Sequence, residues 1–589
     1  MNGVDFLLSV GSCRRCALIH CGVRNYAYFG SSSCVDAKLD EIRRSNRQFG
    51  ALDFNAPNSF TSNLETNQDE PQITSLNLKP SDRELISNDD MEEGMGQNQT
   101  ICVSCIGLLQ EFGCSMEVIS KVCERALAEN YDATSFSLNI SLPVSMSVRG
   151  HVLAAHFSKH NLGDTSKVLG AGVTTAIKDA WKAIVSSVAA SILKKRYAGD
   201  AAELSVPCSA VYDADAQECA AVMSLIGYSG PTVKRQRNRR QRFYKNTKKF
   251  AVNNNEETSN ENHTTAEEDL DSGLNDSNFA KNDQDDTMKS DDSETGYSRQ
   301  TVETVFSGRT VELVTRLCPL TTLSVPQTSI SLVQETPVRE AVYVAGRYCK
   351  YSRELCQTPW VVNGVQKCSE SVEELISAII LPAFKAPELK FLSSGREDVD
   401  VRCVGRGRPF ALCILNARTA SHPPRELRRL QEVINSSTPH ISVAHLQIVD
   451  KESTSVLRYN TENKVKNYCA LCLVRGDVIV TAEFLQPLQG CTPLVVMQQT
   501  PLRVLHRRPL LTRPRTLHAM SAERVNDKFF KVHVRTEAGM YVKELVHGDF
   551  GRTTPNLSLL LAYPVDIVAL DVTNVELDWP KEVTEDDAC

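Results

Sequence analysis

Ser394-Gly-Arg-Glu-Asp-Val-Asp-Val-Arg402, followed by Val404-Gly-Arg-Gly-Arg-Pro-Phe410, is the most informative stretch of this 589-residue chain. It gathers the carboxylates of Glu397, Asp398 and Asp400 among arginines and glycines at the mouth of an expected strand. Taken alone, such a segment is more often a solvated turn. Nearby guanidinium groups would, however, keep an aspartate ionised in a site that also attracts phosphate. Both interpretations stay open on these residues alone.

The C-terminal half around this stretch alternates between strand-like and helix-like segments. Residues 341–344 and 531–535 alternate as strands do. Ser371-Val-Glu-Glu374 is a capping box, and the apolar helix face after it is expected to end at Pro382. Strands interleaved with helices, without Gly-rich nucleotide loops, predict an α+β fold with a mainly antiparallel sheet.

The N-terminal half shows a similar alternation. Residues 108–122 have the apolar spacing of a helix, and residues 136–142 and 204–211 alternate like strands. Residues 171–197 are predicted to form a helix that ends in three basic residues, a favourable charge at a helix C-terminus.

The net charge of −7 hides an uneven distribution. From Glu256 to Glu294 the chain carries 14 acidic residues against two lysines, a composition typical of disorder. Without this block the remainder is mildly basic. The basic run from Lys234 to Lys249 immediately precedes it and could contact RNA, signal nuclear import, form a solvated helix face or pair with the acidic block.

Four of the 20 cysteines have metal-ligand spacing, in Cys13-x-x-Cys16 and Cys102-x-x-Cys105. Two such knuckles can complete a closed Cys₄ zinc site, which would be structural because no coordination position stays open. The separation of the pairs exceeds that of ordinary zinc ribbons, so four unrelated thiols are the alternative. Cys21 and Cys114 are nearby substitutes that lack a paired knuckle. A redox role is less favoured, because no thioredoxin-like βαβ pattern surrounds either pair.

The segment Gly395-Arg-Glu-Asp-Val-Asp-Val-Arg402 resembles the signature of the Pus10 family of tRNA pseudouridine synthases. Within it, Arg396-x-Asp398 is similar to the element that carries the catalytic aspartate in other pseudouridine synthases. The two Cys-x-x-Cys pairs also fall where the family places its zinc ligands. Four further segments resemble family blocks in the same order along the chain, and these are Val344–Arg353, Gln357–Trp360, Thr500–Pro509 and Gly539–Thr553.

The resemblance implies roles for individual residues. Pseudouridine formation needs an ionised carboxylate at the ribose, either to attack C1′ or to remove a sugar proton, and this role falls on Asp398, with Asp400 in reserve on the same side if the segment is extended. Tyr468 is expected to stack on the uracil, which must leave the helical stack to react. Lys543 is expected to pair with Asp398 and lower its pKa, and Leu545 to shape the pocket.

The same resemblance implies how RNA is held. A basic cluster is assigned to phosphate contacts that position RNA without reading its sequence. Arg396 is counted with the substrate-binding residues, and Glu397 is treated as a neighbour rather than the nucleophile. The basic cluster consists of Arg503, His506, Arg507 and Arg508.

The fold expected from the resemblance is a zinc-stapled, THUMP-containing accessory domain followed by a pseudouridine synthase domain. THUMP domains bind tRNA, typically at its acceptor end. The expected segments are 1–44 (first half of the zinc knuckle), 45–100 (disordered linker), 101–250 (accessory domain), 251–298 (acidic insert), 299–323 (end of the accessory domain) and 324–589 (catalytic domain).

Function and partners follow from the same resemblance. We expect a tRNA pseudouridine synthase acting in the TψC arm, with structural Zn²⁺ and no redox or organic cofactor. tRNA is the expected partner, with other structured RNAs as further candidates. We expect a monomer in the nucleus or cytoplasm, with mitochondria left open. No run of about 20 apolar residues predicts a membrane helix. The alternatives are an RNA-binding protein without catalysis and a zinc-dependent scaffold.

Overall fold

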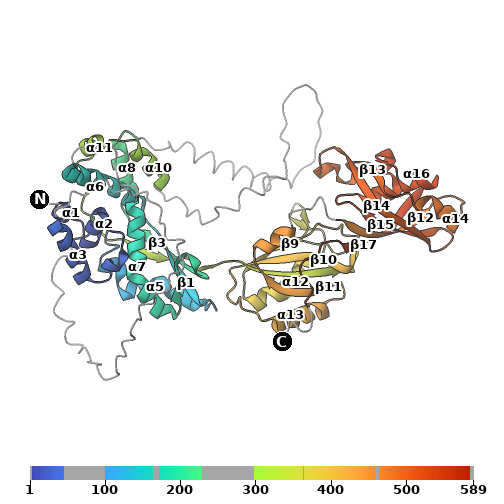
Figure 1. The fold of residues 1–589 in the computed structure, drawn as a ribbon, viewed down its shortest axis with the longest axis horizontal. Coiled ribbons are helices and arrows are strands. Elements are labelled where there is room, and N and C mark those ends of the chain that lie inside the picture. The colour runs from blue at the N-terminus through green and yellow to red at the C-terminus, as the bar shows by residue number, and fades with distance from the viewer. Residues whose placement is uncertain are drawn as a thin grey trace, which may run out of the picture. The chain divides into compact units, whose positions relative to one another are not determined.

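The computed structural model describes residues 3–45, 100–162, 172–228, 297–362, 364–457 and 465–583. Its elements are labelled in Figure 1. The chain forms two compact units. Unit 1 comprises Met1–Arg125, Leu138–Gly199 and Val206–Thr336, and unit 2 comprises Ala126–Ser137, Asp200–Ser205 and Pro337–Cys589. The expected linker 45–100, the run Lys234–Lys249 and nearly all of the insert 251–298 lie outside the described residues.

The N-terminal half is mainly helical. A core of buried apolar side chains joins α6, α8, α10 and α11, and includes Val152, Val222 and Phe306. Its helices are α1 (Gly3–Ser9), α2 (Arg14–His20), α3 (Ser32–Ser45), α4 (Glu111–Cys114), α5 (Met116–Ala128), α6 (Val144–Leu162), α7 (Val173–Leu193), α8 (Asp215–Leu225), α10 (Arg299–Ser307) and α11 (Val311–Leu317).

A small sheet accompanies these helices. The strands run in the order β2-β1-β3-β4, and β5 also pairs with β3. Their bounds are β1 (Ser135–Ser141), β2 (Arg196–Tyr197), β3 (Leu204–Val211), β4 (Ser331–Gln334) and β5 (Val338–Arg339). The two predicted strands of this half therefore correspond to β1 and β3.

Two helix predictions in this half are wrong in their bounds. Helix α7 ends at Leu193 because Lys194 takes the left-handed conformation with φ 53°, and Arg196 already lies in β2. The basic residues thus follow the helix rather than ending it. Within 108–122 the long helix begins only at Met116, since the chain before it forms turns and the short α4.

Unit 2 is built on a ten-stranded sheet. Its order is β11-β6-β10-β17-β12-β15-β14-β13-β16, with β9 pairing β10. Among the pairings that the structure describes, β10 and β17 run parallel, with Arg402 opposite Asp571, and the others are antiparallel. The strands are β6 (Val342–Lys350), β9 (Glu388–Ser393), β10 (Arg402–Leu415), β11 (Ile441–Val449), β12 (Lys466–Val474), β13 (Leu494–Gln499), β14 (Thr512–Arg524), β15 (Phe529–Thr536), β16 (Thr553–Thr554) and β17 (Val565–Val575).

Helices and short elements complete unit 2. A hairpin of β7 (Val361–Val362) and β8 (Val365–Gln366) stands apart from the large sheet. The helices are α12 (Val372–Phe384), α13 (Pro424–Ser437), α14 (Ala482–Leu485), α15 (Val542–His547) and α16 (Leu557–Leu561), and the 3₁₀ turns include η8 (Leu502–Arg507) and η9 (Asp549–Gly551).

Two cores lie on the large sheet. One packs α12 and α13 against β6, β10 and β11, and the other packs α15 and α16 against β12, β13, β14, β15 and β17. The Ser371 hydroxyl accepts a hydrogen bond from the Glu374 amide, which confirms the predicted cap. The predicted stop at Pro382 is wrong, because α12 runs through this proline to Phe384 and ends at Lys385 in the left-handed conformation. The architecture is a mixed α/β fold, and none of the described helices could cross a membrane.

Candidate functional site

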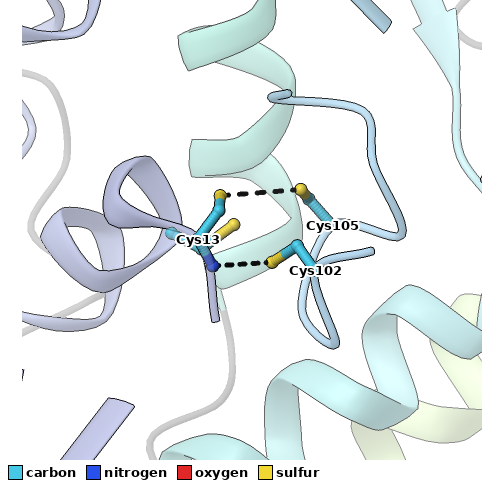
Figure 2. Close-up of side chains that lie close together, drawn as sticks. Cys13, Cys102 and Cys105 are labelled. Atoms are coloured by element: carbon cyan, nitrogen blue, oxygen red, sulfur yellow. Dashed lines mark hydrogen bonds between the residues drawn. The ribbon is translucent and has the colours of Figure 1, made fainter. Parts of the chain in front are cut away.

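The four cysteines with metal-ligand spacing lie together in unit 1. One ligand atom from each of Cys13, Cys16, Cys102 and Cys105 lies within 4.8 Å of the others, so the group could hold a metal ion. Cys13 directly precedes α2, Cys16 lies inside it, and the second pair occupies turns after residue 100. Figure 2 shows the thiols of Cys13 and Cys105, 4.0 Å apart, facing each other across the gap.

The surroundings of this cysteine group fit a closed site. Backbone amides of Cys13 and Ser104 point at the Cys102 sulfur, at 3.1 and 3.4 Å, and amide donors of this kind stabilise a thiolate. All but the partly buried Cys13 are fully enclosed. The two alternatives considered from the sequence, Cys21 and Cys114, do not belong to the group; the Cys114 thiol donates to the Leu108 carbonyl instead.

The second candidate is the carboxylate loop, defined here as Ser394–Val401, between β9 and β10 in unit 2. Gly395 has φ +86°, and a Cβ there would lie 2.9 Å from the Lys466 ammonium nitrogen, so a side chain at this position is disfavoured. The loop then turns, because the Val401 amide donates to the Asp398 carbonyl at 3.1 Å. Asp398 and Asp400 therefore sit on a turn and not on the extended segment that sequence reasoning considered.

A buried lysine holds this loop from beneath. The Lys350 ammonium group donates to the carbonyls of Leu355 and Val399 at 2.8 Å and of Asp398 at 3.2 Å. Burial lowers the pKa of Lys350, and the Glu397 carboxylate opposes that effect. A neighbouring arginine, Arg353, donates to the Asp400 carbonyl at 2.9 Å. Both aspartates are thus fixed through their backbone, which leaves their carboxylates available.

The carboxylates of the loop meet two cations. Arg503 Nη1 lies 2.9 Å from Asp398 Oδ2, and Lys543 Nζ lies 3.4 Å from the same oxygen. Lys543 is closer to Asp400, at 2.7 and 2.8 Å from its two oxygens. Burial raises the pKa of Asp400, but the hydrogen bonds from Lys543 outweigh it and hold that pKa below its usual value.

Arg503 is itself oriented by a carboxylate that sequence reasoning did not single out. Its Nε donates to Glu544 Oε1 at 2.7 Å, and Glu544 is buried on α15. This second partner fixes the guanidinium group in front of Asp398. The sequence prediction assigned Arg503 to phosphate, whereas the structure places it between two carboxylates.

Glu397 has entirely different surroundings from its neighbour Asp398. Its Oε2 lies 2.7 Å from Arg408 Nε, and the two side chains are 0% and 1% exposed. Tyr348 donates a hydrogen bond to Glu397 Oε1 at 2.8 Å, and Gln357 donates to the Tyr348 hydroxyl at 2.7 Å. Burial opposes the charge of Arg408, but Glu397 raises its pKa. This buried pair anchors the loop and faces no solvent.

The two residues expected to contact the uracil are Tyr468 and Leu545, and both lie in unit 2. Tyr468 lies on β12, partly buried against the core of unit 2. Burial raises its pKa to about 12, and the charges of Glu397 and Asp398 add to this while Arg408 opposes it. The phenol therefore stays neutral at physiological pH. Leu545 is buried on α15, the same helix that carries Lys543.

The remaining predicted contacts lie on the surface. Arg396, His506 and Arg508 are exposed, and no ion pair is found for them among the described residues. The side chain of Arg507 lies outside the described part of the chain.

Sequence reasoning missed the basic residues of β6 and of the segment that follows it. Arg347 is buried and donates to backbone carbonyls of β10 and of the chain at and after the end of β17, among them those of Gly407 at 2.9 Å and Leu577 at 2.9 Å. With Lys350 and Arg353 it forms a basic series at every third position of one strand and its exit. Burying a cationic side chain costs free energy unless it has hydrogen-bond partners. Basic residues repeated within an otherwise apolar strand therefore indicate a structural role, and this pattern could have identified Arg347 and Lys350 from the sequence.

Comparison with known proteins covers both units. The model of the family described as "Eukaryotic Pus10, N-terminal" matches residues 102–266, and the model described as "Pus10, C-terminal" matches residues 343–576. The human tRNA pseudouridine synthase Pus10 is 31% identical over 578 residues, which cover 98% of this chain and 97% of the human protein.

Two further similarities cover a smaller share of the chain. A protein of Drosophila melanogaster named putative tRNA pseudouridine synthase Pus10 is 46% identical over 246 residues, covering 41% of this chain and 49% of the fly protein. Among solved structures, a chain from a Cbf5-Nop10-Gar1 complex aligns with a TM-score of 0.23 and 17% identity over 39% of this chain and 48% of that chain.

Proposed function

This chain belongs to the Pus10 family and is a tRNA pseudouridine synthase, an isomerase; from that premise we propose that Asp398 acts at the ribose of a flipped-out uridine in the TψC arm of tRNA. The observation that carries the proposal is the position of the Asp398 carboxylate. It is held by its backbone, contacted by two cations, and 38% exposed, so that a substrate can reach it.

The reaction rearranges uridine without gain or loss of atoms. The N1–C1′ bond breaks, the uracil rotates, and a C5–C1′ bond forms while the proton of C5 leaves and N1 takes up a proton. In one route the Asp398 carboxylate attacks C1′, and C5 of the uracil later displaces the carboxylate from C1′. In the other route Asp398 removes a sugar proton that is later returned. Both routes need the ionised carboxylate, and Arg503 and Lys543 contact it at 2.9 and 3.4 Å.

The surroundings of Asp398 suit a base that has left the helical stack. Tyr468 offers a neutral aromatic ring for the freed uracil, and Leu545 provides an apolar wall on α15. Exposed His506 and Arg508 on and after η8 are proposed to contact phosphates, with Arg396 at the rim of the loop. Arg503 takes a different role, since it positions the Asp398 carboxylate.

The cysteine group is proposed to hold structural Zn²⁺. The residues Cys13, Cys16, Cys102 and Cys105 supply the four sulfur ligands of a closed site, and the ion would join α2 to the turns after residue 100. The helix–strand arrangement of the N-terminal half is proposed to include a THUMP domain that binds tRNA. A nuclear or cytoplasmic location and a monomeric state stay predictions.

The proposal is tested by mapping pseudouridine in unmodified tRNA incubated with wild-type protein or the Asp398→Asn variant. Carbodiimide labelling locates the modified nucleotide, and a filter-binding titration measures RNA affinity. We expect modification of the TψC arm by the wild type alone, with similar affinity for both proteins. Modification by the variant would overturn the role of Asp398. Tight binding without modification by either protein would favour an RNA-binding function.

A further inference from the structure

The turn that follows α15 exposes an aromatic side chain almost completely. Phe550 is 95% exposed, the highest fraction among the large exposed apolar residues that the structure describes. It lies in η9 with φ 56° and ψ 39°, the left-handed conformation that a bulky side chain rarely adopts. Gly548, Asp549 and Gly551 around it also have positive φ, of 83°, 48° and 86°.

The turn is held in this conformation by its neighbours rather than by Phe550. The Asp549 amide donates to His547 Nδ1 at 3.1 Å, and the Gly551 amide donates to the Gly548 carbonyl at 3.0 Å. Gly548 is required there, since a Cβ would lie 2.4 Å from Asn556 Nδ2. The fold therefore keeps a disfavoured backbone at a position whose side chain adds almost no burial. Such strain is typical of functional positions.

The same turn is tied to the residues around Asp398. Asp549 Oδ2 accepts a hydrogen bond from the Leu502 amide at 3.2 Å. The next residue, Arg503, contacts the Asp398 carboxylate at 2.9 Å. Helix α15, which carries Lys543, leads directly into the turn. Phe550 is thus separated from the carboxylate by a short chain of direct contacts within unit 2.

Exposed basic residues follow the segment that is hydrogen-bonded to this turn. The Leu502 amide donates to Asp549, and His506 and Arg508, farther along η8 and just after it, are exposed. An exposed aromatic ring combined with exposed cationic side chains on a connected segment is suited to unpaired nucleobases, because the ring can stack on a base while the cations contact phosphates.

We propose that Phe550 stacks on a nucleobase that flanks the target uridine and so holds the RNA open while the uridine occupies the site at Asp398. This inference rests on the proposed function, and it adds a substrate-contacting residue outside the set predicted from sequence. The occupant is an unpaired base of the RNA substrate. Any of the bases would serve, since each has a face that can stack.

The test uses the full-length protein, an unmodified tRNA transcript and three substitutions of one residue. Phe550→Ala and Phe550→Asn remove the ring, and Phe550→Trp retains a stacking surface. We expect kcat/KM for pseudouridine formation to fall about 5- to 150-fold for the first two and to change less than about threefold for Trp. The matched control is Leu559→Ala, because Leu559 is 60% exposed on α16 and outside the site.

Thermal unfolding separates this role from a structural one. Asn adopts the left-handed conformation more readily than Phe, so the Tm of Phe550→Asn should equal or exceed that of the wild type. A Tm lowered by several degrees in this variant would indicate that Phe550 stabilises the fold, and the proposal would be rejected.

A binding readout makes the test independent of turnover. tRNA carrying 2-aminopurine on either side of the target uridine should lose fluorescence when the base stacks on Phe550 of the wild type, and should not lose it with Phe550→Ala. Equal kcat/KM and equal fluorescence for wild type and Phe550→Ala would overturn the proposal. A wild type that binds this tRNA with quenching but forms no pseudouridine would instead contradict the proposed function.

Discussion

The cysteine group and the carboxylate loop are both assembled from residues far apart in the sequence, but they differ in burial and composition. The cysteine group is uniform and closed, with four thiols within 4.8 Å and three of them fully buried. The carboxylate loop mixes charges of both signs and stays open, with the side chains of Asp398 and Asp400 38% and 64% exposed. A closed set of identical ligands suits a structural ion, whereas an open set of opposed charges suits chemistry on a substrate.

The same contrast recurs within the loop itself. Glu397 and Asp398 are adjacent in the chain, yet Glu397 is fully buried against Arg408 while Asp398 is within reach of solvent. Each carboxylate has an arginine partner, so pairing alone does not separate an anchor from a reactive group. Exposure to solvent is what distinguishes the reactive carboxylate of Asp398 from the anchoring carboxylate of Glu397.

The largest effect is expected in the cysteine group. Replacing Cys16 by Ser, or chelating the metal, should remove one ion per chain and strongly destabilise the N-terminal half, because structural zinc contributes about 10–16 kcal/mol in small metal-dependent domains. Elemental analysis and thermal unfolding measure both effects. Cys21→Ser and Cys114→Ser are the matched controls and should retain the metal. An unchanged metal content in Cys16→Ser would contradict a four-cysteine site.

The next effect concerns the buried pair under the loop. Glu397→Gln should lower the free energy of unfolding of the protein by about 3–5 kcal/mol, because it leaves Arg408 as an uncompensated buried charge. Urea unfolding measures the loss. The double variant Glu397→Gln/Arg408→Met should recover part of it. If the free energy of unfolding fell by less than about 0.5 kcal/mol, Glu397 would behave like an ordinary surface residue. Burial would then not distinguish its role from that of Asp398.

A smaller effect, on turnover, is expected at the open end of the loop. Lys543→Met removes a charge-assisted contact to Asp398, so kcat should fall roughly 10- to 150-fold with little change in Tm. Arg503→Met should lower kcat to a similar extent and also lower the Tm, because it leaves the buried Glu544 carboxylate without its partner. Arg535→Met is the control, since Arg535 pairs with Glu576 away from the loop. The account would be contradicted if Lys543→Met lost stability and kept its turnover.

The smallest effect is a pH dependence at the junction of β10 and β17. Arg402 and Arg353 lower the pKa of Asp571 against the effect of burial. A depressed carboxyl pKa contributes stability above the unfolded value of about 3.9, and that contribution is lost as the pH falls through the folded value. The stability difference between wild type and Asp571→Asn, on the order of 1 kcal/mol at pH 7, should therefore shrink below about pH 4. A difference that stays constant from pH 7 to pH 3 would contradict the assignment.

The sequence predicted all four members of the cysteine group, because the Cys-x-x-Cys spacing of each pair is a local pattern. It was less informative for the carboxylate loop. The block containing Arg503 was recognised, but Arg503 was assigned to phosphate because its partner Glu544 becomes visible only when α15 packs beside η8. The turn at Asp398 was also missed, since Lys350 imposes it from a strand about 50 residues away.

Helix ends show the same limitation. The cap at Ser371 is a local pattern and was predicted, whereas the passage of α12 through Pro382 was not. The apolar face of this helix packs into the core beside β6 and β10, and that tertiary packing outweighs the cost of a proline near the last turn.

The central claim is that Asp398 is the reacting carboxylate, because Glu397 is buried against Arg408 and Lys543 contacts both oxygens of Asp400. The most direct measurement uses tRNA that carries tritium at C5 of its uridines. The rate of tritium release under single-turnover conditions is compared between Asp398→Asn and Asp400→Asn. We expect no release above background for Asp398→Asn, and a reduced but measurable rate for Asp400→Asn, because Asp400 only orients Lys543. Measurable release by Asp398→Asn together with none by Asp400→Asn would contradict the account.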